Sequence, residues 1–378
     1  MKGTVLIVMS SNYQMLFSYL LSKVLRNHTI HYFLMDTKNE QINDDSRRLF
    51  SSNPPVFFEA LKKDWRSLLF RNRKILKSIE KTIHELQPDH IILYKDNDHC
   101  HVKIIETAAT MGSSVTMIQE GLGVYAGKST KKLPSLSMKL LECIGYPKIW
   151  NLSQGYHPLL TTLAVGEPEL LPADKKIEKC VIPIPKYPPE EWLEEIVQYL
   201  SIDRGSRLRN VALYLGQPLV KLGLADEELE KKTLQELFQL LDAKGYDILV
   251  KAHPFEPDEK YDRLSVPVTK VENSIPAELL PSLYKIRAVL TPYSSAGYNL
   301  HTWYGIPTIY LHKLLLKEPL SIANMLVGKA VTSSSECGQL MDEVNKNMTD
   351  ERNVTVDSTR EFKSFLDQIL QPGRRGEH

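Results

Sequence analysis

Two polar motifs in the second half of the sequence each follow a short apolar run. Lys251, His253 and Pro254 follow the run 247–250, and Ser294 and Ser295 follow the run 288–291. Parallel strands end at one edge of their sheet, so we expect both motifs at a single rim, where open α/β sheets bind ligands. An imidazole can give up a proton, and hydroxyl and helix N-terminal N–H groups bind anionic oxygens. The motifs therefore predict a site for a leaving phosphate, of the kind found in nucleotide sugars.

Each motif also has an ordinary structural explanation. A lone histidine is usually a hydrogen-bonding residue of the fold, and Ser294 alone would be a typical helix N-cap. We favour function for His253 because Lys251 lies two residues earlier on the same strand face and a second motif ends a strand in the same half. For the serines the two roles are compatible, since a capped helix N-terminus also attracts anions.

Three further residues are candidates for the same pocket. Gly216 and Gln217 follow the apolar run 211–215, and Glu278 stands near the start of a helix predicted after Pro276. Glycine permits close approach of the backbone to a ligand, and glutamine both donates and accepts hydrogen bonds. Glu278 either complements a helix dipole or binds ribose hydroxyls, and its position leaves both interpretations open.

A carboxylate in the first half is a candidate general base. Glu120 lies between Gln119 and Gly121, directly after the apolar run 115–118. The glycines that follow allow a sharp turn, so Glu120 is expected at the carboxyl rim of its sheet. There it would either take a proton from a hydroxyl group or satisfy N–H groups of its own loop, and the sequence does not distinguish the two.

Two other clusters are less specific. Asp96, Asp98 and His99 belong to a loop rich in metal-ligand types, but no partner cluster exists elsewhere in the sequence. We therefore predict no metal site there and contacts to an acceptor instead. The segment 62–81 carries eight basic and two acidic side chains. Such a run is usually a solvated helix face, but it also suits anionic lipid head groups or an anionic glycan.

The order of apolar and amphipathic segments predicts the fold. Strand-like runs at 5–9, 30–35, 90–94 and 115–119 alternate with helix-length segments at 15–26, 65–87 and 102–111. The second half repeats this alternation after a proline-rich interval at 183–189. We therefore expect an α/β protein of GT-B type, with two Rossmann-like, doubly wound domains facing across a cleft.

The domain limits follow from the same pattern. We expect an acceptor-binding domain over 1–182, a proline-rich linker and helix over 183–203, and a nucleotide-sugar-binding domain over 204–356. The remaining residues, 357–378, are expected to form a C-terminal helix and tail that pack back on the first domain.

Composition excludes several classes of protein. The 378 residues carry a formal charge of +1 and 8% aromatic residues, so no global feature indicates nucleic-acid binding. Four scattered cysteines indicate neither a disulfide scaffold nor a zinc site. The apolar N-terminal run is shorter than a signal peptide requires, and no run approaches the length of a membrane span. We expect a cytoplasmic protein, with peripheral attachment to the inner face of the membrane through 62–81 as an open option.

The motifs in this order resemble those of the bacterial GT-B sialyltransferases, both the lipooligosaccharide sialyltransferases and the capsular polysialyltransferases. The family pattern is Asp/Glu-Asp/Glu-Gly, then His-Pro, then Ser-Ser, and the matching residues are Gln119-Glu120-Gly121, His253-Pro254 and Ser294-Ser295. The run 215–219 also resembles the segment that opens the nucleotide domain of these enzymes. Gln119 occupies the first acidic position, so the base is assigned to Glu120.

The resemblance implies an activity. Glu120 would deprotonate the acceptor hydroxyl, His253 would assist the departing CMP phosphate, and Ser294 and Ser295 would hold that phosphate. Gly216, Gln217, Lys251, Pro254 and Glu278 would line the donor pocket. The implied reaction is an inverting transfer from CMP-sialic acid to a capsule or lipooligosaccharide glycan, with no metal ion or other cofactor.

Three alternatives remain open at this stage. The nearest is another GT-B transferase of surface-polymer assembly, acting on Kdo, hexosyl or glycerophosphate donors. A nucleotide-sugar 2-epimerase and a non-catalytic glycan-binding protein are the others. Acceptor, linkage, single addition or polymerisation, and oligomeric state have no signal in the sequence.

Overall fold

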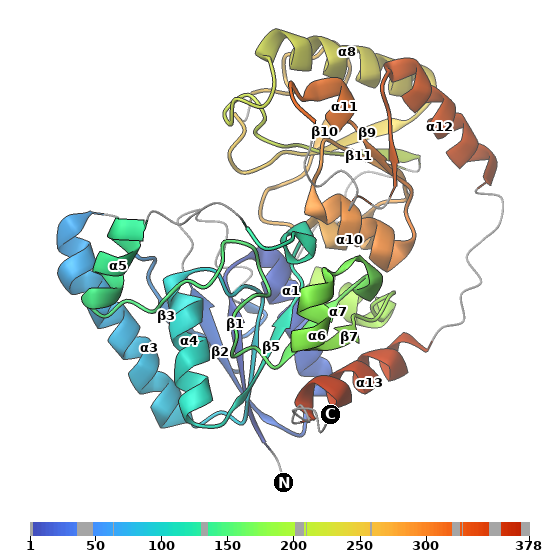
Figure 1. The fold of residues 1–378 in the computed structure, drawn as a ribbon. Helices are drawn as coiled ribbons and strands as arrows, with labels where there is room; N and C mark the ends of the chain where they lie inside the picture. Colours follow the sequence, from blue (N-terminus) through green and yellow to red (C-terminus); the bar gives the residue numbers. More distant parts are fainter. Residues whose placement is uncertain are drawn as a thin grey trace. The chain divides into compact units, whose positions relative to one another are not determined.

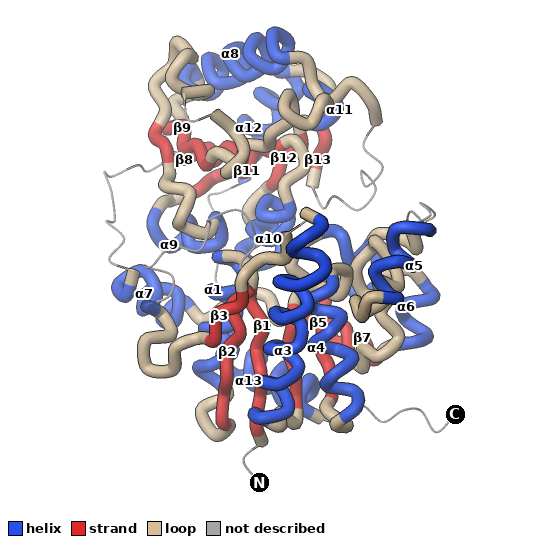
Figure 2. The backbone as a smooth tube through the Cα atoms, turned by 90° about the vertical axis from the view of Figure 1, so that its left-hand side faces the viewer, coloured by secondary structure: helices blue, strands red, loops and turns tan. Residues whose placement is uncertain are grey.

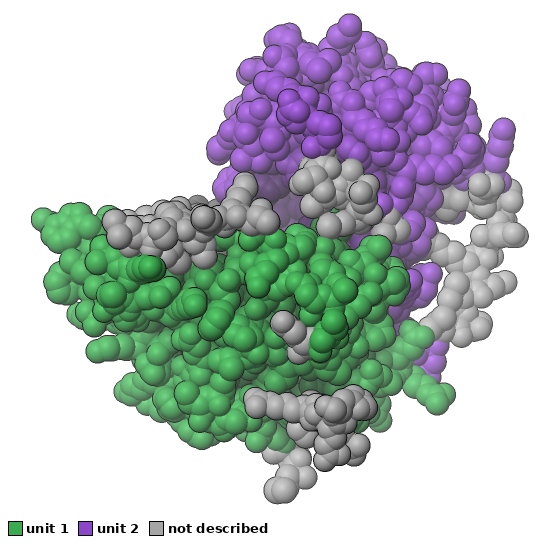
Figure 3. Space-filling view, in the orientation of Figure 1, with its two compact units in different colours: residues 1–185, 359–378 green, residues 186–358 purple. Residues whose placement is uncertain are grey.

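The computed structural model describes residues 3–35, 48–62, 64–129, 135–200, 208, 210–257, 259–319, 326, 328–347 and 357–371. The chain divides into two compact units (Figure 3): residues 1–185 and 359–378 form unit 1, and residues 186–358 form unit 2. Each unit has its own parallel sheet.

The sheet of unit 1 has the strand order β3-β2-β1-β4-β5-β6-β7, and every pair of neighbours is parallel. The strands are β1 (Thr4–Met9), β2 (Thr29–Met35), β3 (Val56–Phe58), β4 (His90–Leu93), β5 (Ser114–Ile118), β6 (Thr162–Val165) and β7 (Cys180–Pro183). Helices cover both faces of such a sheet, which explains why β1, β4 and β5 are continuous apolar runs in the sequence.

The helices of unit 1 lie on both faces of this sheet (Figures 1 and 2). They are α1 (Asn12–Val24), α3 (Asn72–Leu86), α4 (His99–Thr110), α5 (Ser135–Cys143), α6 (Ala173–Glu178) and α13 (Ser358–Leu370), with short π or 3-10 turns η1 (Ser67–Arg71), η2 (Leu122–Tyr125) and η3 (Pro168–Leu170). The strand order reverses between β1 and β4, and right-handed crossovers in opposite directions place their helices on opposite faces. Helices α3 and α4 pack together on one face.

The C-terminal helix belongs to unit 1. From Thr359 onward α13 groups with the first 185 residues. Its apolar side is buried, and the Phe362 ring lies 6.1 Å from that of Phe17 on α1. A segment more than 300 residues away in sequence therefore completes the cover over one face of this sheet.

The sheet of unit 2 has the order β10-β9-β8-β11-β12-β13, again with parallel neighbours. Its strands are β8 (Val211–Leu215), β9 (Asp247–Lys251), β10 (Thr269–Lys270), β11 (Ile286–Thr291), β12 (Thr308–Tyr310) and β13 (Lys329–Ala330). Its helices are α7 (Glu190–Tyr199), α8 (Glu227–Ala243), η4 (Ala277–Leu279), α9 (Leu280–Leu283), α10 (Ser295–Tyr304), α11 (His312–Leu315) and α12 (Ser334–Asn347).

Alternate residues of β8 belong to two separate apolar clusters. Ala212 and Tyr214 pack in one cluster, whereas Val211, Leu213 and Leu215 pack in the other. Because successive strand residues point to opposite faces, this division shows that both faces of the sheet are covered. Unit 2 is therefore doubly wound, like unit 1.

Some segments differ from the sequence-based expectation. The helix expected over 65–87 contains the π turn η1 before α3, and the helix expected from Pro276 is reduced to η4 and the four-residue α9. By contrast, α7 forms within the interval 183–203, where a linker and a helix were expected, and it packs against α9 within unit 2. Within the described residues, no helix is long and apolar enough to cross a membrane.

Candidate functional site

The carboxylate of Glu120 is held by the start of helix α1. Glu120 follows β5, and its Oε1 and Oε2 atoms accept hydrogen bonds from Ser11 Oγ at 2.6 Å and Gln14 Nε2 at 2.7 Å. Ser11 follows β1, so loops from two strands of the same sheet meet at its carboxyl rim. The partly positive N-terminus of α1 also favours a carboxylate at this position.

Both donors to Glu120 are themselves fixed. Ser11 is the N-cap of α1, and its hydroxyl accepts the Gln14 N–H at 3.2 Å. Gln14 is fully buried, and its Oε1 accepts the Ser10 N–H at 2.6 Å and lies 3.1 Å from the Ser10 hydroxyl. The helix cap therefore also serves as a rigid holder for the carboxylate, since each donor has little freedom to rotate.

In unit 2 the predicted motifs follow three adjacent strands. Gly216 follows β8, His253 follows β9 and Ser294 follows β11, and β8 lies between the other two. Two hydrogen bonds connect the three strand ends: Gly216 N–H donates to Lys251 O at 2.9 Å, and the Thr291 hydroxyl donates to Leu215 O at 3.1 Å. The strand order reverses between β8 and β11, which is the position where open α/β sheets bind ligands.

The His253 ring has a defined hydrogen-bond arrangement. Its Nδ1 accepts the Phe255 N–H at 3.2 Å, so the neutral ring carries its proton on Nε2. Partial burial lowers the pKa of His253, and the charges of Lys251 and Lys221 add to this effect while Glu256 opposes it. Near neutral pH the ring is therefore mainly a neutral donor through Nε2, and a bound phosphate would favour its protonated form.

A buried carboxylate positions the His253 loop. Glu256 Oε2 accepts the His253 N–H at 2.7 Å, and its Oε1 accepts from Lys260 at 2.6 Å and from the Tyr261 hydroxyl at 3.0 Å. A Cβ on Gly216 would lie 2.0 Å from Glu256 Oε2. The glycine after β8 is thus required by the close approach of this carboxylate.

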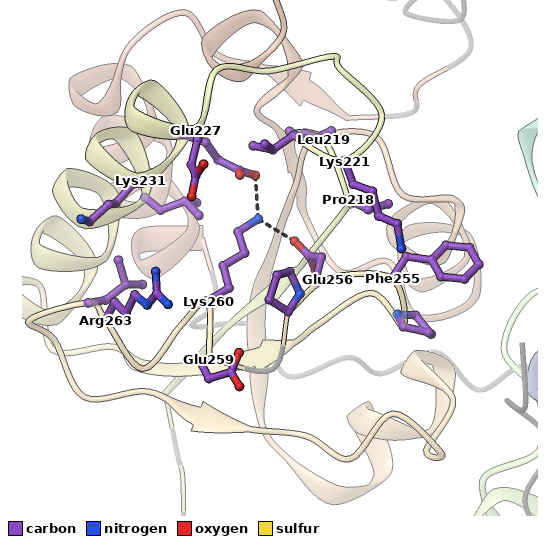
Figure 4. Close-up of a pocket in the computed structure, with 16 residues that line it drawn as sticks. Pro218, Leu219, Lys221, Glu227, Lys231, Phe255, Glu256, Glu259, Lys260 and Arg263 are labelled. Carbon is purple, nitrogen blue, oxygen red and sulfur yellow. Dashed lines mark hydrogen bonds and ion pairs between the residues drawn. The ribbon is translucent and has the colours of Figure 1, made fainter.

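A cavity of about 720 Å³ borders this loop on the α8 side, lined in part by Pro254 and Glu256. The Lys260 ammonium pairs with Glu230 at 2.7 Å and with Glu256 at 2.6 Å, and Figure 4 shows it beside the Glu256 carboxylate. Lys221 and Phe255 also line this cavity, and the Lys221 Nζ atom lies 5.0 Å from the centre of the Phe255 ring. The polar interactions around this cavity help fix the main chain that carries His253.

The remaining candidates for the nucleotide-sugar pocket lie in unit 2, near the ends of β8, β9 and β11. Ser294 caps α10 by accepting the Ala296 N–H at 3.2 Å, and Ser295 is the first residue of that helix. Glu278 is buried and accepts a hydrogen bond from Asn299 of α10 at 2.8 Å. Burial lowers the pKa of Lys251 to about 8, an effect that Glu278 opposes. Gln217 is half-buried in the loop after β8.

The sequence matches one protein family over most of its length. The model of the alpha-2,8-polysialyltransferase (POLYST) family matches residues 6–313. This chain belongs to the alpha-2,8-polysialyltransferase family. The resemblance to bacterial sialyltransferases is thereby confirmed, and the chain is a glycosyltransferase of the sialyltransferase type, which uses a nucleotide-sugar donor and a glycan acceptor.

Solved structures with a similar fold confirm the GT-B class of two Rossmann-like domains. The UDP-GlcNAc 2-epimerase of Neisseria meningitidis has a TM-score of 0.56 and 15% identity, with 97% of this chain and 99% of that chain covered. The Methanocaldococcus jannaschii UDP-GlcNAc 2-epimerase gives 0.55 and 12%, with the same coverage. Phytolacca americana UGT2, bound to UDP-2-fluoro-glucose and pterostilbene, gives 0.50 and 14%, with 99% and 95% covered. No curated protein sequence matches significantly.

Gln119, at the first acidic position of the polysialyltransferase-like motif, is a buried structural residue. Its Oε1 accepts hydrogen bonds from the Tyr125 hydroxyl and from Gly166 N–H, both at 2.8 Å. The Tyr125 hydroxyl in turn accepts the Glu167 N–H at 2.9 Å. Gln119 thus ties the turn after Glu120 to the end of β6.

The acceptor candidates Asp96, Asp98 and His99 have local partners. Asp96 is buried and accepts the N–H groups of Gly155 and His157 at 2.9 and 2.8 Å, and burial raises its pKa. Asp98 caps α4 and pairs with His101 Nδ1 at 2.9 Å, and His99 Nδ1 lies 3.0 Å from Pro147 O. A role in acceptor binding stays a prediction. Across the described residues, no group of three acidic, His or Cys side chains is arranged to hold a metal.

Sequence reasoning missed the residues that support the site. Ser11 and Gln14 carry only the signal of a helix start, and Glu256 carries the signal of a carboxylate three residues after His253. No feature of the sequence indicated a structural role for Lys175. It is buried, its ammonium donates to Val124 O and to Ala126 O, and burial lowers its pKa to about 8.

Proposed function

We propose that this chain transfers sialic acid from CMP-sialic acid to a glycan acceptor with inversion at the anomeric carbon and without a metal ion. The membership of the alpha-2,8-polysialyltransferase family supports this proposal most strongly. A chain ending in an α2,8-linked sialic acid is the first acceptor to test. The clustering of Gly216, His253 and Ser294 at three adjacent strand ends supports a nucleotide-sugar site in unit 2.

In the proposed reaction Glu120 is the general base. The acceptor hydroxyl oxygen attacks the anomeric carbon and its proton passes to a Glu120 oxygen, while the bond from that carbon to the phosphate oxygen breaks. The bond electrons leave with CMP. The transition state has oxocarbenium character, which the carboxylate of the sialic acid itself helps stabilise. Ser11 and Gln14 keep Glu120 oriented, so the base does not have to be ordered during the reaction.

His253 and the start of α10 stabilise the leaving group. The proton on His253 Nε2 is directed by the Phe255 bond to Nδ1, and it is available to an oxygen of the departing phosphate. Ser294, Ser295 and the N-terminal N–H groups of α10 offer further donors and a favourable dipole. CMP has only one phosphate, so hydrogen bonds can balance its charge without a divalent ion. Gly216, Gln217, Lys251, Pro254 and Glu278 would surround the nucleoside.

The proposal is tested with a panel of CMP-, UDP-, GDP- and CDP-linked sugar donors, in EDTA, with an α2,8-linked oligosialic acid as acceptor. We expect CMP release and acceptor elongation only with CMP-sialic acid. Glu120→Gln should lower the turnover rate by about 10²- to 10⁴-fold while CMP still binds. His253→Ala should lower the rate and weaken CMP binding. The matched controls Glu169→Gln and His84→Ala, both at exposed positions, should retain activity.

Other outcomes of this panel would replace the proposal. The structural similarity to UDP-GlcNAc 2-epimerases makes an epimerase the alternative to examine, although identities of 12–15% show the fold alone. Binding of UDP without CMP, together with epimerisation of UDP-GlcNAc, would favour that function. Release of another nucleotide would indicate a different GT-B transferase, and no release from any donor would favour a glycan-binding role.

A further inference from the structure

One surface of unit 1 combines exposed aromatic rings with free cations. Edge strand β3 exposes Phe57 (48%), and the helical segment after it exposes Trp65 (64%) and Phe70 (67%). Phe57 and Phe70 line a groove of about 520 Å³ together with Lys74. Large apolar side chains are usually covered in a stable fold, so three exposed ones on β3 and the helical segment after it indicate an interaction surface.

The π turn η1 places the aromatic and basic side chains on one side. The Asn72 N–H donates to Ser67 O, five residues back, so each turn is longer than in an α-helix and Phe70 lies one turn after Trp65 and Arg66. Along α3, Lys74 and Lys77 follow Phe70 at helical spacing, whereas Leu76, Ile79 and Ile83 are buried. Helix α3 therefore buries one face and exposes a basic face, and its first turns line the same groove as β3.

The cations of this surface are not neutralised by neighbours. Arg66, Arg73, Lys74 and Lys77 are exposed, and none forms an ion pair with a described residue. The nearby acids have other partners: Glu59 pairs with Arg71, Glu80 pairs with Lys103, and Asp64 accepts the Ser67 N–H at 2.9 Å. The Arg66 guanidinium lies 5.3 Å from the centre of the Trp65 ring, which places charge and aromatic surface together.

We propose that this basic aromatic surface (Phe57, Trp65, Arg66, Phe70, Arg73, Lys74 and Lys77) docks on an anionic lipid bilayer. Lys and Arg side chains are attracted to acidic head groups, and Trp and Phe side chains lose apolar exposure when they enter the interface. An anionic glycan would satisfy the charges and would stack on single rings, whereas the bilayer interface covers Phe57, Trp65 and Phe70 together, so the bilayer fits better. The proposal is independent of the proposed transferase activity.

The test is flotation of the full chain with vesicles of phosphatidylcholine alone or with one third phosphatidylglycerol. We expect binding to the anionic vesicles that weakens steeply with added salt. Lys74→Gln/Lys77→Gln should weaken partitioning about 25-fold, at roughly fivefold for each charge. Trp65→Ser/Phe70→Ser should weaken it at least about tenfold. The controls Lys176→Gln/Lys363→Gln and Ile177→Ser, at exposed positions of the same unit, should bind like the parent chain.

Three outcomes would overturn the proposal. The first is equal binding to neutral and anionic vesicles, or no binding to either. The second is equal loss of binding in the test and control variants when their thermal unfolding shows that all are folded. The third outcome has three parts. Soluble α2,8-linked oligosialic acid binds the parent chain, Lys74→Gln/Lys77→Gln abolishes this binding, and Trp65→Ser/Phe70→Ser binds vesicles like the parent chain. Together these results would assign the surface to a glycan.

Discussion

The contact of Ser11 with Glu120 allows a test of how the proposed base is held. Ser11 has two roles that substitutions can separate: it caps α1 and it donates to Glu120 Oε1 at 2.6 Å. Ser11→Gly removes the donor but costs the helix only a few tenths of a kcal/mol, whereas Ser11→Ala removes the donor and costs about 0.5–2 kcal/mol of stability. Ser11→Thr keeps the hydroxyl and both roles.

The magnitude follows from the charge on the acceptor. A hydrogen bond to a charged group contributes about 1.5–3 kcal/mol, which corresponds to roughly a 10- to 150-fold change. Gln14 still holds the other carboxylate oxygen in the variant, so we expect the lower part of this range, about 10- to 30-fold in kcat. Donor KM should not change, because Ser11 and the predicted nucleotide site belong to different units.

The assay is the initial rate of CMP release at saturating donor and acceptor, with urea unfolding of each variant measured alongside. Ser11→Ala should match Ser11→Gly in kcat but unfold at lower urea, and Ser11→Thr should restore the parent kcat. Parent-like kcat in folded Ser11→Gly would refute the positioning role, as would a loss of rate that simply follows the loss of stability.

Three other measurements test the supporting structure. Gly216→Ala forces a Cβ against Glu256 and should lower the free energy of unfolding, measured by urea titration, by about 1–3 kcal/mol. Gly127 has open space around it, so Gly127→Ala should not have this effect. Equal effects of the two substitutions would contradict the close approach of Glu256 to Gly216. Glu256→Gln should destabilise unit 2 by about 1–3 kcal/mol and lower kcat. The reason is that Lys260 loses a charged partner and the His253 N–H loses its charged acceptor. An unchanged urea midpoint and an unchanged rate would exclude this role of Glu256. Burial, with a smaller effect of Lys179, lowers the pKa of His157 to about 4, so the unfolded chain takes up a proton at higher pH than the folded chain. Stability is therefore lost as pH falls from about 6.5 to 4, by at most about 3.5 kcal/mol. His157→Asn should flatten this slope, and an equally steep slope in that variant would contradict the assignment.

The sequence by itself determined the fold class and the rim positions of the motifs. Parallel strands buried on both faces are continuous apolar runs, as in β1 and β8, and the alternation with amphipathic segments is visible without any contact information. A residue directly after such a run lies at the carboxyl edge of its sheet. The placements of Glu120, His253 and Ser294 after their strands therefore followed from local pattern alone.

The short or irregular elements were not predictable in the same way. Strands β3 and β13 contain three and two residues, too few to show a period, and the π turn η1 has the composition of an ordinary helix. Their conformations depend on neighbouring strands and helices. The exposure of Phe57 and Phe70 is a consequence of these elements, so the basic aromatic surface was visible in the sequence only as a run of charge.

Only the tertiary structure decided which side chains support the site. Ser11 and Glu120 are 109 positions apart in sequence and meet because β1 and β5 end at the same rim, one strand apart in the sheet. Gly216 and Glu256 meet for the same reason at the ends of β8 and β9. Strand order is set by the packing of both sheet faces over long sequence separations, and local propensity carries no information about it. The residue types of each motif therefore determine which chemistry it can support. The side chains that orient the motif are determined by the order of the strands in the folded sheet.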